Sequence, residues 1–201
     1  MTSDMPRLSK YCSLYFHGLC EMALYTAERI SVAMRVCKRV VPVRLPSTVA
    51  SVLFVCRANI CRSPLAATYF ESLIQKRRGS IDVRSAGFEV TPGRPADSIS
   101  KVVARQQHVS LDAHVATQLY SELVDRSDLI VVMEMSQKDR INRLYPKAKG
   151  KTVLLGSFDS SGSLEIRDPY GRSIEEFQFC LEQIMRCCNS LSQRLGLRDG
   201  V

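Results

Sequence analysis

Two short apolar runs rich in β-branched residues limit what this chain can fold into. Val49–Val55 and Asp128–Met133 lack the alternation of polar and apolar residues that a half-exposed strand shows. Continuous apolar strands are typical of parallel sheets that are covered on both faces. Ile81–Arg84 and Lys151–Leu155 predict two further strands. Because helical segments separate the four runs, we expect an α/β protein. Its core would be a small doubly wound four-stranded parallel sheet with helices on both faces.

Helix-start signals support this alternation. The sequence predicts helices over residues 63–74, 97–107, 136–145 and 173–195. Pro64 occupies a first helical position, where proline is favoured. Asp97 is placed to cap the second helix. Ser173 and Glu176 have the spacing of a capping box at the start of the last helix.

Proline residues separate an N-terminal extension from this pattern. Pro42 and Pro46 interrupt any helix, so we divide the chain into residues 1–48 and residues 49–201. Residues 9–41 predict one long amphipathic helix with a narrow polar stripe, which would form a helical extension needing a partner. That partner would be the protein's own body, another chain or a membrane surface. Alternatively, translation starts at an internal methionine such as Met34, and the extension is not made.

Charge and cysteine content narrow the function classes. The net charge of +8 divides into seven basic and three acidic residues in 1–48, and 21 and 17 in 49–201. No basic cluster with interleaved aromatic residues occurs, so nucleic acid is the weakest partner class. The eight cysteines lack the spacing of a disulfide scaffold, and no secretory signal is evident, so we expect a cytoplasmic protein with free thiols. On the last helix, Cys180 and Cys188 are expected in or near the core and Cys187 at the surface.

One segment carries the chemistry. Residues 55–64 read Val-Cys-Arg-Ala-Asn-Ile-Cys-Arg-Ser-Pro and join the first strand to the first helix. Free amides at a helix start bind anions, and Arg62 adds a fork that suits two phosphate oxygens. Cys56 would lie at the bottom of this positive cup as a thiolate, placed to attack phosphorus and form a cysteinyl-phosphate. No group of residues has metal-ligand spacing, and the chemistry requires no cofactor.

This segment resembles the signature V-C-x-G-N-x-C-R-S-P of the low-molecular-weight protein tyrosine phosphatase family, with Ala58 in place of one glycine. The resemblance covers about residues 49–195. It continues through the groups Ser85-Ala86-Gly87, His114-Val115-Ala116, Met133-Glu134 and Asp168-Pro169-Tyr170. Gly171 follows where many eukaryotic members have a second aromatic residue, and the next residues, Arg172-Ser173, look more like those of the bacterial members.

The resemblance implies a role for each matching residue. Cys56 would be the nucleophile, Arg62 would bind phosphate and the transition state, and Asp168 would be the general acid. Ser63 would donate a hydrogen bond to the thiolate. Asn59 would hold the loop in an unusual backbone conformation, with His114 supporting it. The rest of the substrate site would be formed by Arg57, Ala58, Ile60, Cys61 and Tyr170. Cys61 is either a small buried residue or the partner of Cys56 in a protective disulfide.

The function implied is hydrolysis of phosphotyrosine in a phosphorylated protein. Bacterial members often act on a tyrosine autokinase of exopolysaccharide production, although no residue here identifies that substrate. One alternative is a thiol-linked arsenate reductase, which needs two more cysteines, and none lies between Cys61 and Cys180. Another is a phosphoarginine phosphatase, whose members carry threonine where this chain has Ile60. The last is an inactive phosphate-binding interaction protein, against which the intact Cys56, Arg62 and Asp168 argue.

Overall fold

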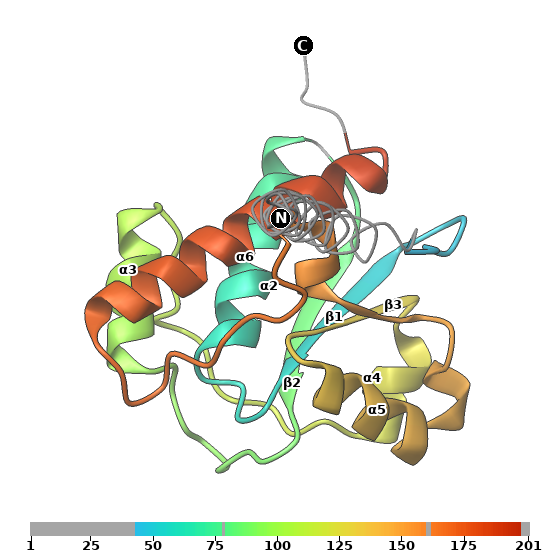
Figure 1. The fold of residues 1–201 in the computed structure, drawn as a ribbon, viewed down its shortest axis with the longest axis horizontal. Coiled ribbons are helices and arrows are strands. Elements are labelled where there is room, and N and C mark those ends of the chain that lie inside the picture. The colour runs from blue at the N-terminus through green and yellow to red at the C-terminus, as the bar shows by residue number, and fades with distance from the viewer. Residues whose placement is uncertain (1–42, 78, 160–161, 198–201) are drawn as a thin grey trace, which may run out of the picture. The chain divides into compact units, whose positions relative to one another are not determined.

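A parallel sheet of four strands forms the centre of the computed structural model (Figure 1). The strands are β1 (Ser51–Cys56), β2 (Asp82–Gly87), β3 (Leu129–Val132) and β4 (Thr152–Leu154). Their order across the sheet is β2-β1-β3-β4, and all three neighbouring pairs are parallel. The predicted fold class is confirmed. Because the strands are parallel, their carboxyl ends lie along one edge of the sheet, where open α/β sheets place their ligand sites.

The structure describes residues 43–77, 79–159 and 162–197. The helix expected over residues 9–41 lies outside the described residues. Within the described part of the chain, no helix has both the length and the hydrophobicity needed to span a bilayer.

Strand β1 occupies a central position because it pairs on both sides. Val52 lies opposite Val83 of β2 and Leu129 of β3, and Cys56 lies opposite Gly87. The Asp128 carboxylate fixes the start of β1 by accepting hydrogen bonds from the backbone N–H groups of Ala50 and Ser51 at 2.9 and 3.0 Å. This register carries Cys56 to the carboxyl edge of the sheet.

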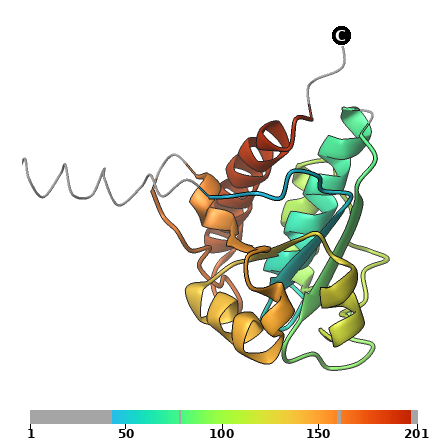
Figure 2. The same cartoon turned by 90° about the vertical axis from the view of Figure 1, so that its right-hand side faces the viewer.

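Helices cover both faces of the sheet. The described helices are α2 (Arg62–Lys76), α3 (Ser98–Gln106), α4 (Ser121–Arg126), α5 (Met135–Leu144) and α6 (Ile174–Arg194), with short 3₁₀ turns at Pro146–Ala148 and Leu155–Phe158. Helices α2, α3 and α6 share one buried cluster with Val52 and Phe54, whereas α4 and α5 share the other with Leu53 and Val55. Alternate β1 side chains therefore enter opposite cores. Figure 2 shows α2 and α6 running together on their side of the sheet.

The structure confirms one local prediction and contradicts two others. Asp97 is an N-cap, as predicted, because its side chain accepts hydrogen bonds from the N–H groups of Ile99 and Ser100. The capping box is wrong: Ser173 is the N-cap residue of α6, but its side chain makes no capping bond. It hydrogen-bonds the Glu175 carboxylate instead and lowers the pKa of that group. Cys187 is fully buried rather than at the surface, because α6 packs on α2 and on the 3₁₀ turn at Leu155–Phe158.

Candidate active site

The loop between β1 and α2 is wrapped around the sulfur of Cys56. The side chain is 3% exposed, and its Sγ accepts hydrogen bonds from the Asn59 N–H at 3.3 Å and from Ser63 Oγ at 3.0 Å. Among the described residues other than glycine, only Asn59 (φ +55°) and His108 have a positive φ. The Ala58 methyl group is therefore compatible with its backbone, although the family signature has glycine there.

Asn59 is held from four directions. Its Nδ2 donates to Ser63 Oγ at 2.8 Å and to Ser85 Oγ at 2.9 Å, and its Oδ1 accepts from the Thr117 N–H at 2.8 Å. Its carbonyl oxygen lies 2.7 Å from His114 Nε2. Burial lowers the pKa of His114, so the ring is neutral and donates through Nε2. This bracing fixes a left-handed backbone position that asparagine tolerates better than most residues.

Gly87 lets the loop lie directly on the end of β2. A Cβ atom at this position would meet Asn59 N at 2.8 Å, and Ala58 C and Arg57 O at 2.9 Å. All three are backbone atoms, so any side chain at Gly87 would displace the loop. The sequence contains Gly87 in the family pattern, but the close approach that requires glycine appears only in three dimensions.

Arg62 is a buried cation whose side chain is fixed by its neighbours. It is 1% exposed, and its Nη1 donates to the Ile166 carbonyl at 3.0 Å and to the Glu134 carboxylate. Its Nη2 pairs with Asp168 Oδ2 at 2.8 Å. Burial opposes the charge, but Cys56, Glu134 and Asp168 together outweigh burial, and the pKa of Arg62 is raised. Its Nε is buried with no hydrogen-bond partner among the described residues, and a phosphate oxygen is an acceptor of the right kind.

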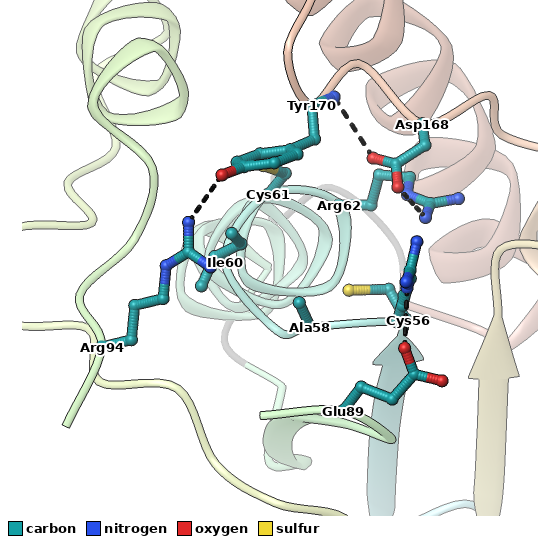
Figure 3. Close-up of a pocket in the computed structure, with 10 residues that line it drawn as sticks. Cys56, Ala58, Ile60, Cys61, Arg62, Glu89, Arg94, Asp168 and Tyr170 are labelled. Carbon is teal, nitrogen blue, oxygen red and sulfur yellow. Dashed lines mark hydrogen bonds and ion pairs between the residues drawn. The ribbon is translucent and has the colours of Figure 1, made fainter. Parts of the chain in front are cut away.

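Asp168 and Tyr170 form the opposite wall of the site, from the segment before α6. Asp168 accepts a hydrogen bond from the Tyr170 N–H at 3.3 Å, and its side chain is 38% exposed. Tyr170 is about half exposed, and its hydroxyl oxygen lies 2.9 Å from Arg94 Nη2. Figure 3 shows Asp168, Arg62 and Tyr170 around a hollow with Cys56 at its base. A carboxyl group here is partly in contact with solvent, as proton exchange with water requires.

The structure brings the predicted site residues together. The hollow has a volume of about 240 Å³ and is lined by the predicted residues Cys56, Arg57, Ala58, Ile60, Cys61, Arg62, Asp168 and Tyr170, and also by Glu89 and Arg94. Three predicted residues do not line the hollow: Asn59 lies within the loop and contacts the Cys56 sulfur through its N–H, and Ser63 and His114 contact that sulfur and the Asn59 carbonyl. The described residues contain no group of three or more side chains arranged to hold a metal ion.

Three charged residues of the site received no role from the sequence. Glu134 lies two residues after β3, and its place at the carboxyl edge of the sheet is the signal that could have identified it. Glu89 and Arg94 lie in irregular segments after β2, where no periodicity or motif marks them.

Cys61 provides a test of oxidative protection. It is 3% exposed and lines the same hollow as Cys56. We expect mild peroxide to oxidise the Cys56 thiolate to sulfenic acid, which the Cys61 thiol then converts to a disulfide with release of water. A thiol reductant should restore activity. Burial raises the pKa of Cys61, so disulfide closure should be the slower step.

Peptide mapping and recovered phosphatase activity measure this outcome. The Cys61→Ser variant should lose activity irreversibly under the same peroxide treatment, because nothing intercepts the sulfenic acid. Cys56 recovered as sulfonic acid beside an unmodified Cys61 in the unaltered protein would show that no protective bridge forms.

Comparison with known proteins agrees with this geometry. Residues 51–199 match the family described as low molecular weight phosphotyrosine protein phosphatase. The chain is 38% identical over 128 residues to the probable low molecular weight protein-tyrosine-phosphatase AmsI of Erwinia amylovora, which covers 64% of this chain and 85% of that protein. The chain is also 33% identical over 144 residues to the protein-arginine-phosphatase of Geobacillus stearothermophilus. That match covers 72% of this chain and 95% of the relative.

A solved structure is similar throughout the described fold. The tyrosine phosphatase Wzb from Escherichia coli K30, in complex with sulphate, superimposes with a TM-score of 0.69 at 33% sequence identity. The match covers 74% of this chain and 100% of that one.

Proposed function

Because this chain belongs to the low molecular weight phosphotyrosine protein phosphatase family, we propose that it hydrolyses phosphotyrosine in proteins through a cysteinyl-phosphate. The observation that carries the proposal is the arrangement around one sulfur. Cys56 Sγ accepts two hydrogen bonds at the base of a hollow, and the same hollow is lined by Arg62 and Asp168. Those three residues supply a nucleophile, an anion-binding cation and a proton donor.

In the first step, the Cys56 thiolate attacks phosphorus and the bond from phosphorus to the tyrosine oxygen breaks. Arg62 and the N–H groups of the loop bind the equatorial oxygens, where negative charge is spread in the transition state. Asp168 in its protonated form gives its proton to the leaving phenolate oxygen. Tyr170 at the mouth offers an aromatic face on which the substrate ring can stack.

In the second step, water attacks the phosphorus of the cysteinyl-phosphate and the sulfur–phosphorus bond breaks. The Asp168 carboxylate takes a proton from that water, which restores the acid form for the next cycle. The hydrogen bonds from Ser63 Oγ and the Asn59 N–H stabilise the thiolate as it leaves. Inorganic phosphate then dissociates from Arg62.

The proposed substrate is a tyrosine-phosphorylated protein in the cytoplasm. A tyrosine autokinase of exopolysaccharide production is the candidate that the family resemblance supplies. Ile60 is the residue that favours tyrosine over arginine, because it is buried, lines the hollow and is apolar where arginine phosphatases carry threonine. Its contact would suit the phenyl ring better than a guanidinium group.

Two matched peptides, one with phosphotyrosine and one with phosphoarginine at the same position, test this function through phosphate release. We expect kcat/KM to be higher for the phosphotyrosine peptide by about tenfold or more, the scale of discrimination by apolar contacts. The Ile60→Thr variant should narrow that ratio, whereas Ile60→Val, which keeps an apolar side chain, should preserve most of it. A higher kcat/KM for the phosphoarginine peptide in the unaltered protein would refute phosphotyrosine as the substrate class and favour phosphoarginine.

A further inference from the structure

A second hollow adjoins the catalytic one. It has a volume of about 320 Å³ and shares Arg57 and Glu89 with the hollow above Cys56. Its other charged lining residues are Glu134, which is paired with Arg62, and two arginines of α5, Arg140 and Arg143. An extended peptide advances about 3.3 Å per residue, so a substrate chain would reach this second hollow within about three residues of its phosphotyrosine.

The second hollow has an excess of positive charge. Glu89 binds two arginines at once, with Oε2 at 2.8 Å from Arg57 Nε and Oε1 at 2.9 Å from Arg140 Nη1. The hydrogen bonds from Arg57 and then Arg140 lower the pKa of Glu89, so the carboxylate stays charged. Three arginines against Glu89 and Glu134 leave a net charge of +1 on the lining, and Glu134 is itself paired with Arg62. Arg143 forms no ion pair with another described residue.

Arg140 is held in position by its neighbours. The Arg140 guanidinium lies over the Phe88 ring, 4.6 Å from its centroid, and Glu89 holds its Nη1. Phe88 is 8% exposed and gives the hollow an apolar wall. Arg140 remains 40% exposed and Arg143 is exposed, so N–H groups of both are available to a ligand from solvent. The fixed guanidinium group of Arg140 and the exposed one of Arg143, beside an apolar wall, suit a carboxylate on a short aliphatic stem.

We propose that Arg140 and Arg143 bind an aspartate or glutamate side chain of the substrate within about three residues of the phosphotyrosine. This inference rests on the proposed function and adds a sequence preference to it. The attraction is partly exposed to solvent, so its effect on kcat/KM should be about three- to tenfold. It should appear mainly in KM and weaken as salt is added.

Phosphotyrosine peptides that carry either glutamate or glutamine at one of the three positions on each side test the preference. At one or more positions the glutamate peptide should have the higher kcat/KM, and the glutamine peptide is the reference for each enzyme. Arg143→Gln should bring the two values together. Arg143→Glu should reverse the preference and favour a lysine peptide, a result that loss of structure does not produce.

Arg126→Gln is the matched control, because this exposed arginine ends α4 near Ser51, at the amino edge of the sheet. It should keep the unaltered protein's preference for glutamate.

Equal kcat/KM values for the glutamate and glutamine peptides at every position would overturn the inference and leave the phosphatase function intact. A preference for glutamate that survives in Arg143→Glu would overturn it as well, since the substrate carboxylate would then be bound by other residues. A gain from a second phosphotyrosine but never from glutamate would contradict the proposed carboxylate ligand. No hydrolysis of any phosphotyrosine peptide would instead refute the proposed function.

Discussion

Replacing Cys56 by serine should lower phosphate release from phosphotyrosine by about 10⁴-fold or more while the folded protein still binds sulphate. The serine hydroxyl is protonated at neutral pH and is a much weaker nucleophile than a thiolate, so the attack on phosphorus is slowed to that extent. Arg62 and the loop N–H groups remain, and they are the groups that would bind the anion. Steady-state kinetics and titration calorimetry with sulphate measure the two effects separately.

Cys187→Ser is the matched control, because it makes the same atom replacement in the core cluster that α6 shares with α2. It should retain activity wherever it remains folded. A Cys56→Ser protein with near-normal turnover would end the cysteinyl-phosphate mechanism, and one that is inactive but fails to bind sulphate would assign Cys56 a role in holding the loop.

Asp168→Asn should reduce the rate on phosphotyrosine by about two to four orders of magnitude, which is the scale of general acid–base catalysis. Asparagine cannot protonate the leaving phenolate. The loss should shrink for aryl phosphates whose leaving group is a weaker base. Sulphate should bind at least as tightly, because the carboxylate that pairs with Arg62 Nη2 at 2.8 Å is no longer present to compete with it.

A series of aryl phosphates with different leaving-group basicities is the measurement. Glu165→Gln is the control on the same segment, since its side chain accepts from the Met135 N–H and does not line the catalytic hollow. An equal loss on every leaving group would mean that Asp168 acts by positioning Arg62 or the segment rather than by proton transfer.

The fold was predictable where burial is complete. Strands β1 and β3 consist almost wholly of buried apolar residues. Such a run indicates a buried strand from the local sequence alone, without knowledge of the strands that pair with it. Helix α4 was not predicted, because six residues are too short to show a helical period. The capping box at Ser173 failed because a neighbouring carboxylate, Glu175, competes for the same hydroxyl. Local sequence does not reveal whether the hydroxyl will accept from a backbone N–H, as a capping box requires, or donate to a nearby carboxylate.

The site was predictable where it is contiguous. Cys56, Arg62 and the loop between them follow from a strand that leads directly into a helix. Arg94 and Glu89 come from irregular chain, and Ile166 contributes only its carbonyl oxygen, which no side-chain pattern encodes. The requirement for glycine at Gly87 depends on how closely the loop after β1 approaches the end of β2, so it is a property of the tertiary structure rather than of the residues near it in sequence.

The fixed side chain of Arg62 affects the entropy of substrate binding. Ordering a free arginine side chain costs about 2 kcal/mol in lost rotamer freedom. Here Glu134 and the Ile166 carbonyl hold the guanidinium before any phosphate arrives, so most of that freedom is lost when the chain folds. A phosphate group therefore meets a preorganised cation, and its affinity is not reduced by the ordering of this side chain.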